Sequence, residues 1–195
     1  MTEGTAAGLL PLPFVRADHF EVVAAYVEHF YRAGAEPPAA VRAPLRYADL
    51  YDLSPWEARY CVRHLLRLPQ LLGRRGVPYD LAVEAAWLRH GAWVDAMGAA
   101  PADGIAAAPP PCFTTEEQQQ LAQRLLALVE VATRLGVAPL QSLCAALVAN
   151  LLVGQPEAQV RAVLAPPGGR PLAPFTEEKR AALLRQHPWL DASAA

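Results

Sequence analysis

The stretch that decides the fold runs from Leu121 to Leu164 and reads LAQRLLALVEVATRLGVAPLQSLCAALVANLLVGQPEAQVRAVL; PFTEEKRAALLRQHPWL follows from Pro174 to Leu190. Its first part predicts a helix with one buried face, because apolar residues recur at three- and four-residue spacing. These residues are Leu121, Leu125, Leu128, Val129, Ala132 and Leu135. Gly136 is expected to end this helix, since glycine tolerates the left-handed conformation found just past a helix C-terminus.

Three more helices are predicted after Gly136. Pro139 suits the first turn of a helix that runs to Gly154. A shorter helix opens at Gln155-Pro156-Glu157, and breakers follow at 166–169. Thr176 then caps a last helix, because its side chain can accept a hydrogen bond from a free backbone N–H. The C-terminal part is therefore expected to be four short helices joined by tight turns.

This order of helices resembles the C-terminal half of the SKP adaptors (S-phase kinase-associated proteins), which hold F-box proteins in cullin-type ubiquitin ligases. The matching residues are Ala132, Leu135, Val148-Ala149-Asn150, Gly154, Arg161, Phe175-Thr176-Glu177-Glu178 and Trp189. A second match lies near the start, where three segments resemble a strand and helix of the same family. They are Pro11-Leu12-Pro13-Phe14-Val15, Val22-Val23 and Tyr26-Val27-Glu28-His29.

The resemblance implies a mainly α protein in three parts. Residues 1–45 would be a partial BTB/POZ-like strand and helix, 46–113 a helical insert with a Pro/Ala-rich linker, and 114–195 an SKP-type F-box-binding domain. Residues 1–16 are expected to be extended because of their prolines, and in the family this segment is the third BTB/POZ strand. The elements that precede it in the family have no place before Met1. Either they have been lost or the sequence begins late.

Composition limits the classes of function. A length of 195 residues with 53% hydrophobic residues is sufficient for one domain or two small ones. The net charge of −2 gives no electrostatic reason to expect a nucleic-acid partner. No apolar run is long enough for a membrane span, and no secretory signal is recognised at the N-terminus. Three widely spaced cysteines predict free thiols in a reducing compartment. Cytoplasmic or nuclear residence is expected.

The first helix after the arm is predicted to begin at a cap, Asp18, and to end at Gly34. Its buried face would carry Phe20, Val23, Val27 and Phe30, which lie at three- and four-residue spacing.

Ser54-Pro55-Trp56-Glu57 is a strong helix start in the insert, with serine at the cap and glutamate three residues later. Arg59, Arg63 and Arg67 then form a basic stripe, which Arg74 and Arg75 extend. The stripe is interpreted as a solvated face or, alternatively, as a docking surface for an acidic partner or nucleic acid.

Asp80 is expected to cap another helix in the insert, running through Leu81, Ala85 and Leu88 toward Met97. Trp87 and Trp93 are predicted to be core anchors.

Nothing in the chain predicts catalysis, a metal site or a cofactor. The histidines lack the paired spacing of a zinc hydrolase helix, and Gly168-Gly169 lacks the strand and lysine of a phosphate loop. An enzyme is not expected.

The resemblance instead implies a non-catalytic adaptor. Residues that would contact an F-box protein are Leu126, Val129, Gln141, Ala145, Val148, Phe175 and Trp189. The alternative from periodicity alone is that these are ordinary helical core.

Possible cullin contacts are Tyr26, His29, Thr133 and Arg134. An Asn-Tyr pair occupies the last two positions in the family, and this departure argues against cullin binding. The second hypothesis is therefore a non-ligase scaffold that holds a structural partner in the same helical groove, without cullin.

Overall fold

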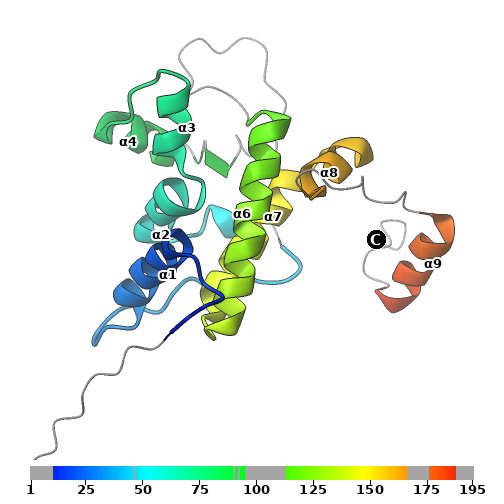
Figure 1. Cartoon of the computed structure of the whole chain (residues 1–195), viewed down its shortest axis with the longest axis horizontal. Helices are drawn as coiled ribbons and strands as arrows, with labels where there is room; N and C mark the ends of the chain where they lie inside the picture. Colours follow the sequence, from blue (N-terminus) through cyan, green and yellow to red (C-terminus); the bar gives the residue numbers. More distant parts are fainter. Residues whose placement is uncertain are drawn as a thin grey trace, which may run out of the picture.

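The structure is a computed structural model that describes residues 11–45, 47–89, 91, 93–94, 113–166 and 176–187 (Figure 1). Within these ranges the chain is helical and contains no strand. The helices are α1 (Ala17–Phe30), the 3-10 turn η1 (Tyr47–Leu50), α2 (Pro55–Tyr60), the π-helical η2 (Cys61–Leu65), α3 (Leu68–Arg74), α4 (Leu81–Arg89), α6 (Thr115–Arg134), α7 (Ala138–Leu152), α8 (Glu157–Leu164) and α9 (Glu177–Gln186). The prediction of a mainly α protein is confirmed.

The helix boundaries predicted in the C-terminal part are also confirmed. Gly136 has a φ of +72°, and the Val137 N–H donates to the Ala132 carbonyl at 2.9 Å, which closes the end of α6. Gly154 has the same φ after α7. Thr176 caps α9 by accepting from the Lys179 N–H at 3.4 Å.

One hydrophobic core joins all three predicted segments of the chain. Helix α6 packs against α7 and α8 and also contacts α1. The core includes Tyr26 from the first segment, Leu65 from the insert and Leu125 from the C-terminal part. Cys61 and Cys144 are both buried in it as free thiols. The division into three domains remains a prediction.

The N-terminal predictions need correction. Residues 11–16 form a turn, in which the Val15 N–H donates to the Leu12 carbonyl at 3.0 Å, and not the expected strand. A strand needs a neighbour to pair with, and the described residues supply none. The part of the expected arm before Pro11 lies outside the described residues.

The predicted cap and buried face of α1 were also partly wrong. Asp18 does not cap the helix but pairs with Arg16 at 3.1 Å. The buried face consists of His19, Val22, Val23 and Tyr26. Phe20 is 46% exposed, because the face is rotated toward α2, where the Tyr60 hydroxyl donates to the buried Val22 carbonyl at 2.7 Å.

The helix start at Ser54 has the predicted capping box, with both hydrogen bonds formed. The helix does not continue to Arg67, however. It widens into η2, and Arg67 adopts a left-handed conformation with a φ of +52°. This kink starts α3 in a new direction.

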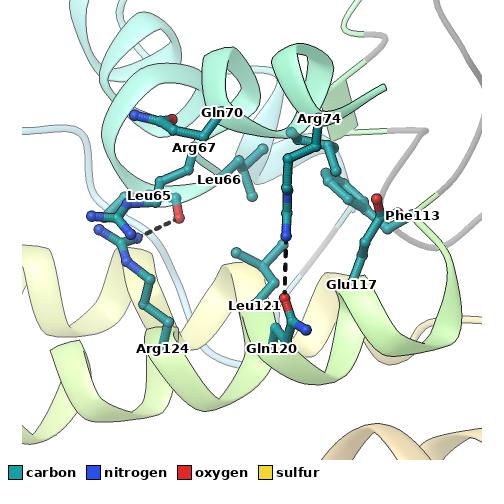
Figure 2. A pocket seen from close by; sticks show the side chains of 11 residues that line it. Leu65, Leu66, Arg67, Gln70, Arg74, Phe113, Glu117, Gln120, Leu121 and Arg124 are labelled. Atoms are coloured by element: carbon teal, nitrogen blue, oxygen red, sulfur yellow. Dashed lines mark hydrogen bonds between the residues drawn. The ribbon is translucent and has the colours of Figure 1, made fainter. Parts of the chain in front are cut away.

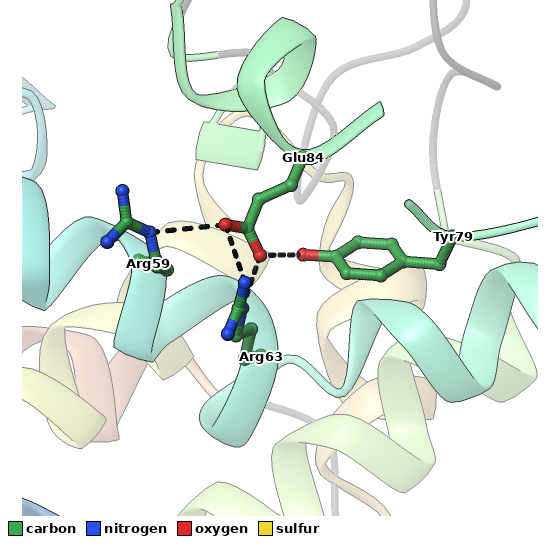
Figure 3. Close-up of polar contacts among 4 residues, drawn as sticks. All are labelled: Arg59, Arg63, Tyr79 and Glu84. Atoms are coloured by element: carbon green, nitrogen blue, oxygen red, sulfur yellow. Dashed lines mark hydrogen bonds and ion pairs between the residues drawn. The ribbon is translucent and has the colours of Figure 1, made fainter. Parts of the chain in front are cut away.

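The basic stripe is not a plain solvated face, and three of its five arginines are already paired with acids. Arg75 pairs with Glu117, and Arg59 and Arg63 pair with Glu84. Glu84 of α4 is only 3% exposed, and Arg59 lies 3.1 Å from its Oε1 (Figure 3). Arg63 donates to both carboxylate oxygens, with Nη2 2.9 Å from Oε1, and the Tyr79 hydroxyl donates to Oε2 at 2.6 Å. Two stripe arginines therefore neutralise one buried acid and hold α2 and η2 to α4.

This cluster corrects the predicted face of α4. The helix is capped by Asp80, whose Oδ1 accepts from the Val83 N–H at 2.8 Å. Its buried residues are Glu84 and Trp87, whereas Leu81 is 75% exposed and Ala85 is exposed. Trp87 and Trp93 are core anchors as predicted, each 2% exposed. Helix α4 is described to Arg89, and Gly91 beyond it has a φ of +61°, which breaks the predicted continuous run to Met97. Residues 95–112, which include the predicted linker up to Cys112, lie outside the described residues.

Candidate functional site

The residues implied as F-box contacts differ widely in burial. Leu126 of α6 is 46% exposed and Val129 is half-buried. On α7, Ala145 is exposed, Gln141 is half-buried and Val148 is 8% exposed. Phe175 and Trp189 lie outside the described residues.

The three α7 residues follow one side of the helix, since positions i, i+4 and i+7 share a face. Ala145 also borders a shallow depression of about 240 Å³ between α7 and the loop Val41–Leu45. Val148 belongs to the core and is not an open groove position in this structure. A contact through Val148 would therefore require it to be uncovered.

On α6, the exposed Leu126 lies one turn beyond the region covered by the end of α8. Gln119 and Gln123 both donate to the Ala165 carbonyl, at 3.0 and 3.1 Å. Gln159 of α8 donates to Thr115 and Gln118 near the start of α6. Leu126 follows Gln119 and Gln123 along α6 and is left open to solvent.

Helix α9 buries none of its own residues. Leu183 is 39% exposed, and in Figure 1 the helix lies beyond α8 at the edge of the molecule. Most of the stability of a short helix comes from packing its apolar face rather than from intrinsic propensity. The described part of this chain gives α9 little such packing.

The predicted cullin contacts do not form one surface. Tyr26 is 1% exposed in the core, which corrects its prediction as a surface contact. The His29 ring stacks on Trp56 with 3.8 Å between ring centroids. Thr133 and Arg134 are exposed, but Arg134 pairs with Glu130 at 2.6 Å and lies 5.2 Å from the centroid of the Phe14 ring.

A second candidate site is a pocket of about 330 Å³ between η2, α3 and α6, which we call the arginine pocket (Figure 2). It is lined by Leu65, Leu66, Arg67, Gln70, Leu71, Arg74, Phe113, Glu117, Gln120, Leu121 and Arg124. Leucines and Phe113 supply its apolar wall, and three arginines supply positive charge.

Arg124 is anchored to the protein backbone rather than to an acid. Its Nη1 donates to the carbonyls of His64 and Leu65 at 2.9 and 2.8 Å. Its Nε and Nη2 are buried and have no hydrogen-bond partner among the described residues. Burial first, and the charge of Arg67 second, lower the pKa of Arg124 to about 10. The guanidinium is thus held in place with two donors unused.

The acid in the pocket wall is already neutralised. Glu117 accepts from Arg75 Nη2 at 2.5 Å and from the Thr114 N–H at 2.8 Å. Burial alone would raise the pKa of Glu117, but these two partners hold it below the usual glutamate value.

Sequence reasoning did not find the arginine pocket. The sequence pattern places Arg67 and Arg74 in one basic stripe with Arg59 and Arg63. In the structure, Arg59 and Arg63 pair with Glu84, whereas Arg67 and Arg74 line the pocket. The available signal was Arg124, a cation directly before Leu125, which is one of the predicted buried positions of this helix.

Comparison with protein-family models, curated proteins and solved structures finds no match for this chain. Among the described residues, no helix has the length and apolarity that crossing a bilayer requires.

Proposed function

We propose that this chain is a non-catalytic adaptor that binds an F-box protein through its C-terminal helices, within a Skp–cullin–F-box type ubiquitin ligase. The sequence resemblance motivates the proposal, and the exposure of Leu126 is the structural observation that best supports it. A leucine left 46% exposed on an otherwise well-packed helix offers an apolar contact for a partner helix.

The lack of packing around helix α9 also supports this proposal. It follows α8 in the chain yet buries no residue in the described structure. Amphipathic helices are recognised through apolar anchors at helical spacing. A partner helix bound against α6 in this way would present an apolar surface on which α9 could pack. The complex would then be closed by the segment that carries Phe175 and Trp189.

The alternative is a scaffold that uses the same helices for a structural partner and has no cullin. Arg134 favours this alternative, because its charge is already taken by Glu130 and by the face of Phe14. A cullin would have to replace both contacts or dock around them.

A binding experiment with purified components tests the proposal. The full chain is immobilised and a recombinant F-box domain is added, followed by the N-terminal domain of a cullin. Capture of the F-box domain with cullin supports the ligase adaptor, whereas capture without cullin supports the scaffold. Failure to bind any of a panel of F-box domains rejects both.

Leu126→Arg tests the proposed contact, and Leu81→Arg is its matched control. Both leucines are exposed and lie on helices, so the two substitutions are comparable. Leu126→Arg should reduce capture at least about tenfold, which corresponds to a loss of 1.4 kcal/mol. Leu81→Arg should leave capture unchanged. Val148→Asp is unsuitable, since it buries a charge in the core and would unfold the protein.

A further inference from the structure

We propose that the arginine pocket binds a phosphate monoester carried on an apolar stem. This site lies on the α3 side of α6 and is separate from the helical surface proposed for an F-box partner. Its argument depends only on the residues that line the pocket.

The charge balance of the pocket favours an anion. Arg67, Arg74 and Arg124 line it, and the one acid in its wall, Glu117, is paired with Arg75. Among the described residues, Arg74 forms its hydrogen bond with a neutral group, Gln120 Oε1, at 3.5 Å. Asp18 acts electrostatically on Arg67 and Arg124, but it lies outside the lining and pairs with Arg16. The three pocket arginines therefore still repel one another across a small volume. A bound anion removes this repulsion.

The unused donors of Arg124 point to an oxyanion. A buried N–H without an acceptor is costly, and a native structure rarely leaves two of them on one side chain. In Figure 2 the guanidinium groups of Arg67 and Arg124 lie next to each other at one end of the pocket. An oxyanion bound beside Arg67 would accept from its guanidinium, as guanidinium groups commonly bind phosphate. A small shift of the Arg124 side chain would bring its buried Nε and Nη2 to the same anion.

The backbone of Arg67 supplies an independent observation. Its φ of +52° is left-handed, a conformation that costs a residue with a Cβ roughly 1–2 kcal/mol and that suits glycine or asparagine better. Such strain is concentrated at functional sites. The charge of Arg67 acts on Asp18, His19 and Arg124, and none of these interactions requires a left-handed backbone.

The choice between phosphate and carboxylate follows from charge and acceptor number. A phosphate monoester carries about −1.5 to −2 charge at pH 7 and has three strong acceptor oxygens. Three arginines match this better than they match a carboxylate with a single charge. The apolar stem follows from Leu66, Leu121 and Phe113, which form the remaining wall. A volume of about 330 Å³ accommodates a small ligand of this kind.

Calorimetric titration of the full chain tests the proposal with phenyl phosphate, inorganic phosphate and benzoate as probes. Phenyl phosphate should bind about tenfold tighter than either of the others, since only it combines the dianion with an apolar ring. Equal or tighter binding of benzoate overturns the phosphate assignment, and equal binding of inorganic phosphate overturns the apolar stem. No binding of phenyl phosphate overturns the proposal as a whole.

Variants locate the binding. Arg67→Asn removes one cation at a position that asparagine tolerates, so the fold should survive and affinity for phenyl phosphate should fall about tenfold. Arg32→Gln is the matched control, because it removes the same charge from an exposed position outside the pocket and should leave affinity unchanged. Equal affinity of the Arg67→Asn variant and the wild type overturns the site.

A short blocked peptide that contains phosphotyrosine distinguishes the source of the ester. Tighter binding than that of phenyl phosphate assigns the site to a phosphorylated protein partner, and weaker binding assigns it to a free small ester. Because these probes involve no F-box protein or cullin, a failure here is distinct from a failure of the adaptor proposal.

Discussion

Arg63 and Glu84 form a two-point ion pair between η2 and α4, in which one guanidinium contacts both oxygens of a nearly buried carboxylate. The side chain of Arg63 is 40% exposed and that of Glu84 is 4% exposed. The pair therefore lies at the boundary between solvent and core. It determines which face of α4 points inward, with Tyr79 and Arg59 completing the shell around the acid.

Replacement of Glu84 by glutamine should lower the free energy of unfolding by about 2 kcal/mol, because the two arginines lose the charge that compensates them. Urea denaturation monitored by circular dichroism measures the change. Glu21→Gln on the exposed surface of α1 is the control and should change stability by less than about 0.5 kcal/mol. An equal effect of both variants would contradict the role given to the cluster.

The same cluster predicts acid sensitivity. Burial would raise the pKa of Glu84, but the hydrogen bonds from Arg63 and Tyr79 and the charges of Arg63 and Arg59 hold it below the ordinary glutamate value. A carboxyl whose pKa is lower in the folded state stabilises the protein above its unfolded pKa and loses this contribution as pH falls through the folded pKa. The stability difference between wild type and Glu84→Gln should thus be constant from pH 7 to 5 and shrink below about pH 4.3. Denaturation at a series of pH values tests this, and a difference that grows on acidification would contradict it.

Glu57 joins the start of α2 to the proline-rich loop before it. Its carboxylate is buried and accepts from the Ala39 N–H at 2.9 Å and the Ser54 N–H at 3.2 Å. Glu57→Ala should cost about 2 kcal/mol and increase amide exchange at Ala39. Ser54→Ala removes the cap and the hydroxyl hydrogen bond to Glu57 Oε2, but it leaves the Oε1 contact with Ala39. This variant should cost about 1 kcal/mol without exposing Ala39. If the Ala39 amide hydrogen exchanges at the same rate in both variants, Glu57 does not anchor the loop.

Arg67→Gly should stabilise the protein, in contrast to most substitutions by glycine. Relief of the left-handed strain outweighs the greater freedom of glycine in the unfolded chain, and we expect a gain of about 0.5 kcal/mol. Arg74→Gly, within the ordinary helical conformation of α3, should instead cost about 1 kcal/mol. The midpoint of thermal unfolding of each variant provides the measurement. A lower midpoint for Arg67→Gly than for the wild type would contradict the argument that the left-handed conformation of Arg67 is strained.

Helix starts and ends could be predicted from the sequence because their chemistry is local. The capping box at Ser54, the cap at Thr176 and the glycine at Gly136 act on backbone groups within a few residues. The same holds for the cap at Asp80. Asp18 is the exception, since Arg16 competes for its carboxylate.

The buried faces of α1 and α4 were decided only by the tertiary structure. Periodicity favoured Phe20 on α1 and Leu81 on α4, yet both are exposed while His19 and Glu84 are buried. Alanine-rich helices have a weakly marked apolar face, so partners elsewhere in the chain select the side that packs. For Glu84 the selecting partner is Arg63, 21 residues earlier.

The sequence by itself determined where most of the helices begin and end, because caps and breakers act through neighbouring backbone groups. Only the tertiary structure decided which charges meet. Arg59 and Arg63 are used to neutralise Glu84, whereas Arg67 turns away at a left-handed residue and joins Arg124, 57 positions later in the sequence. An electrostatic site of this kind depends on distances in space, and spacing along one helix cannot encode them.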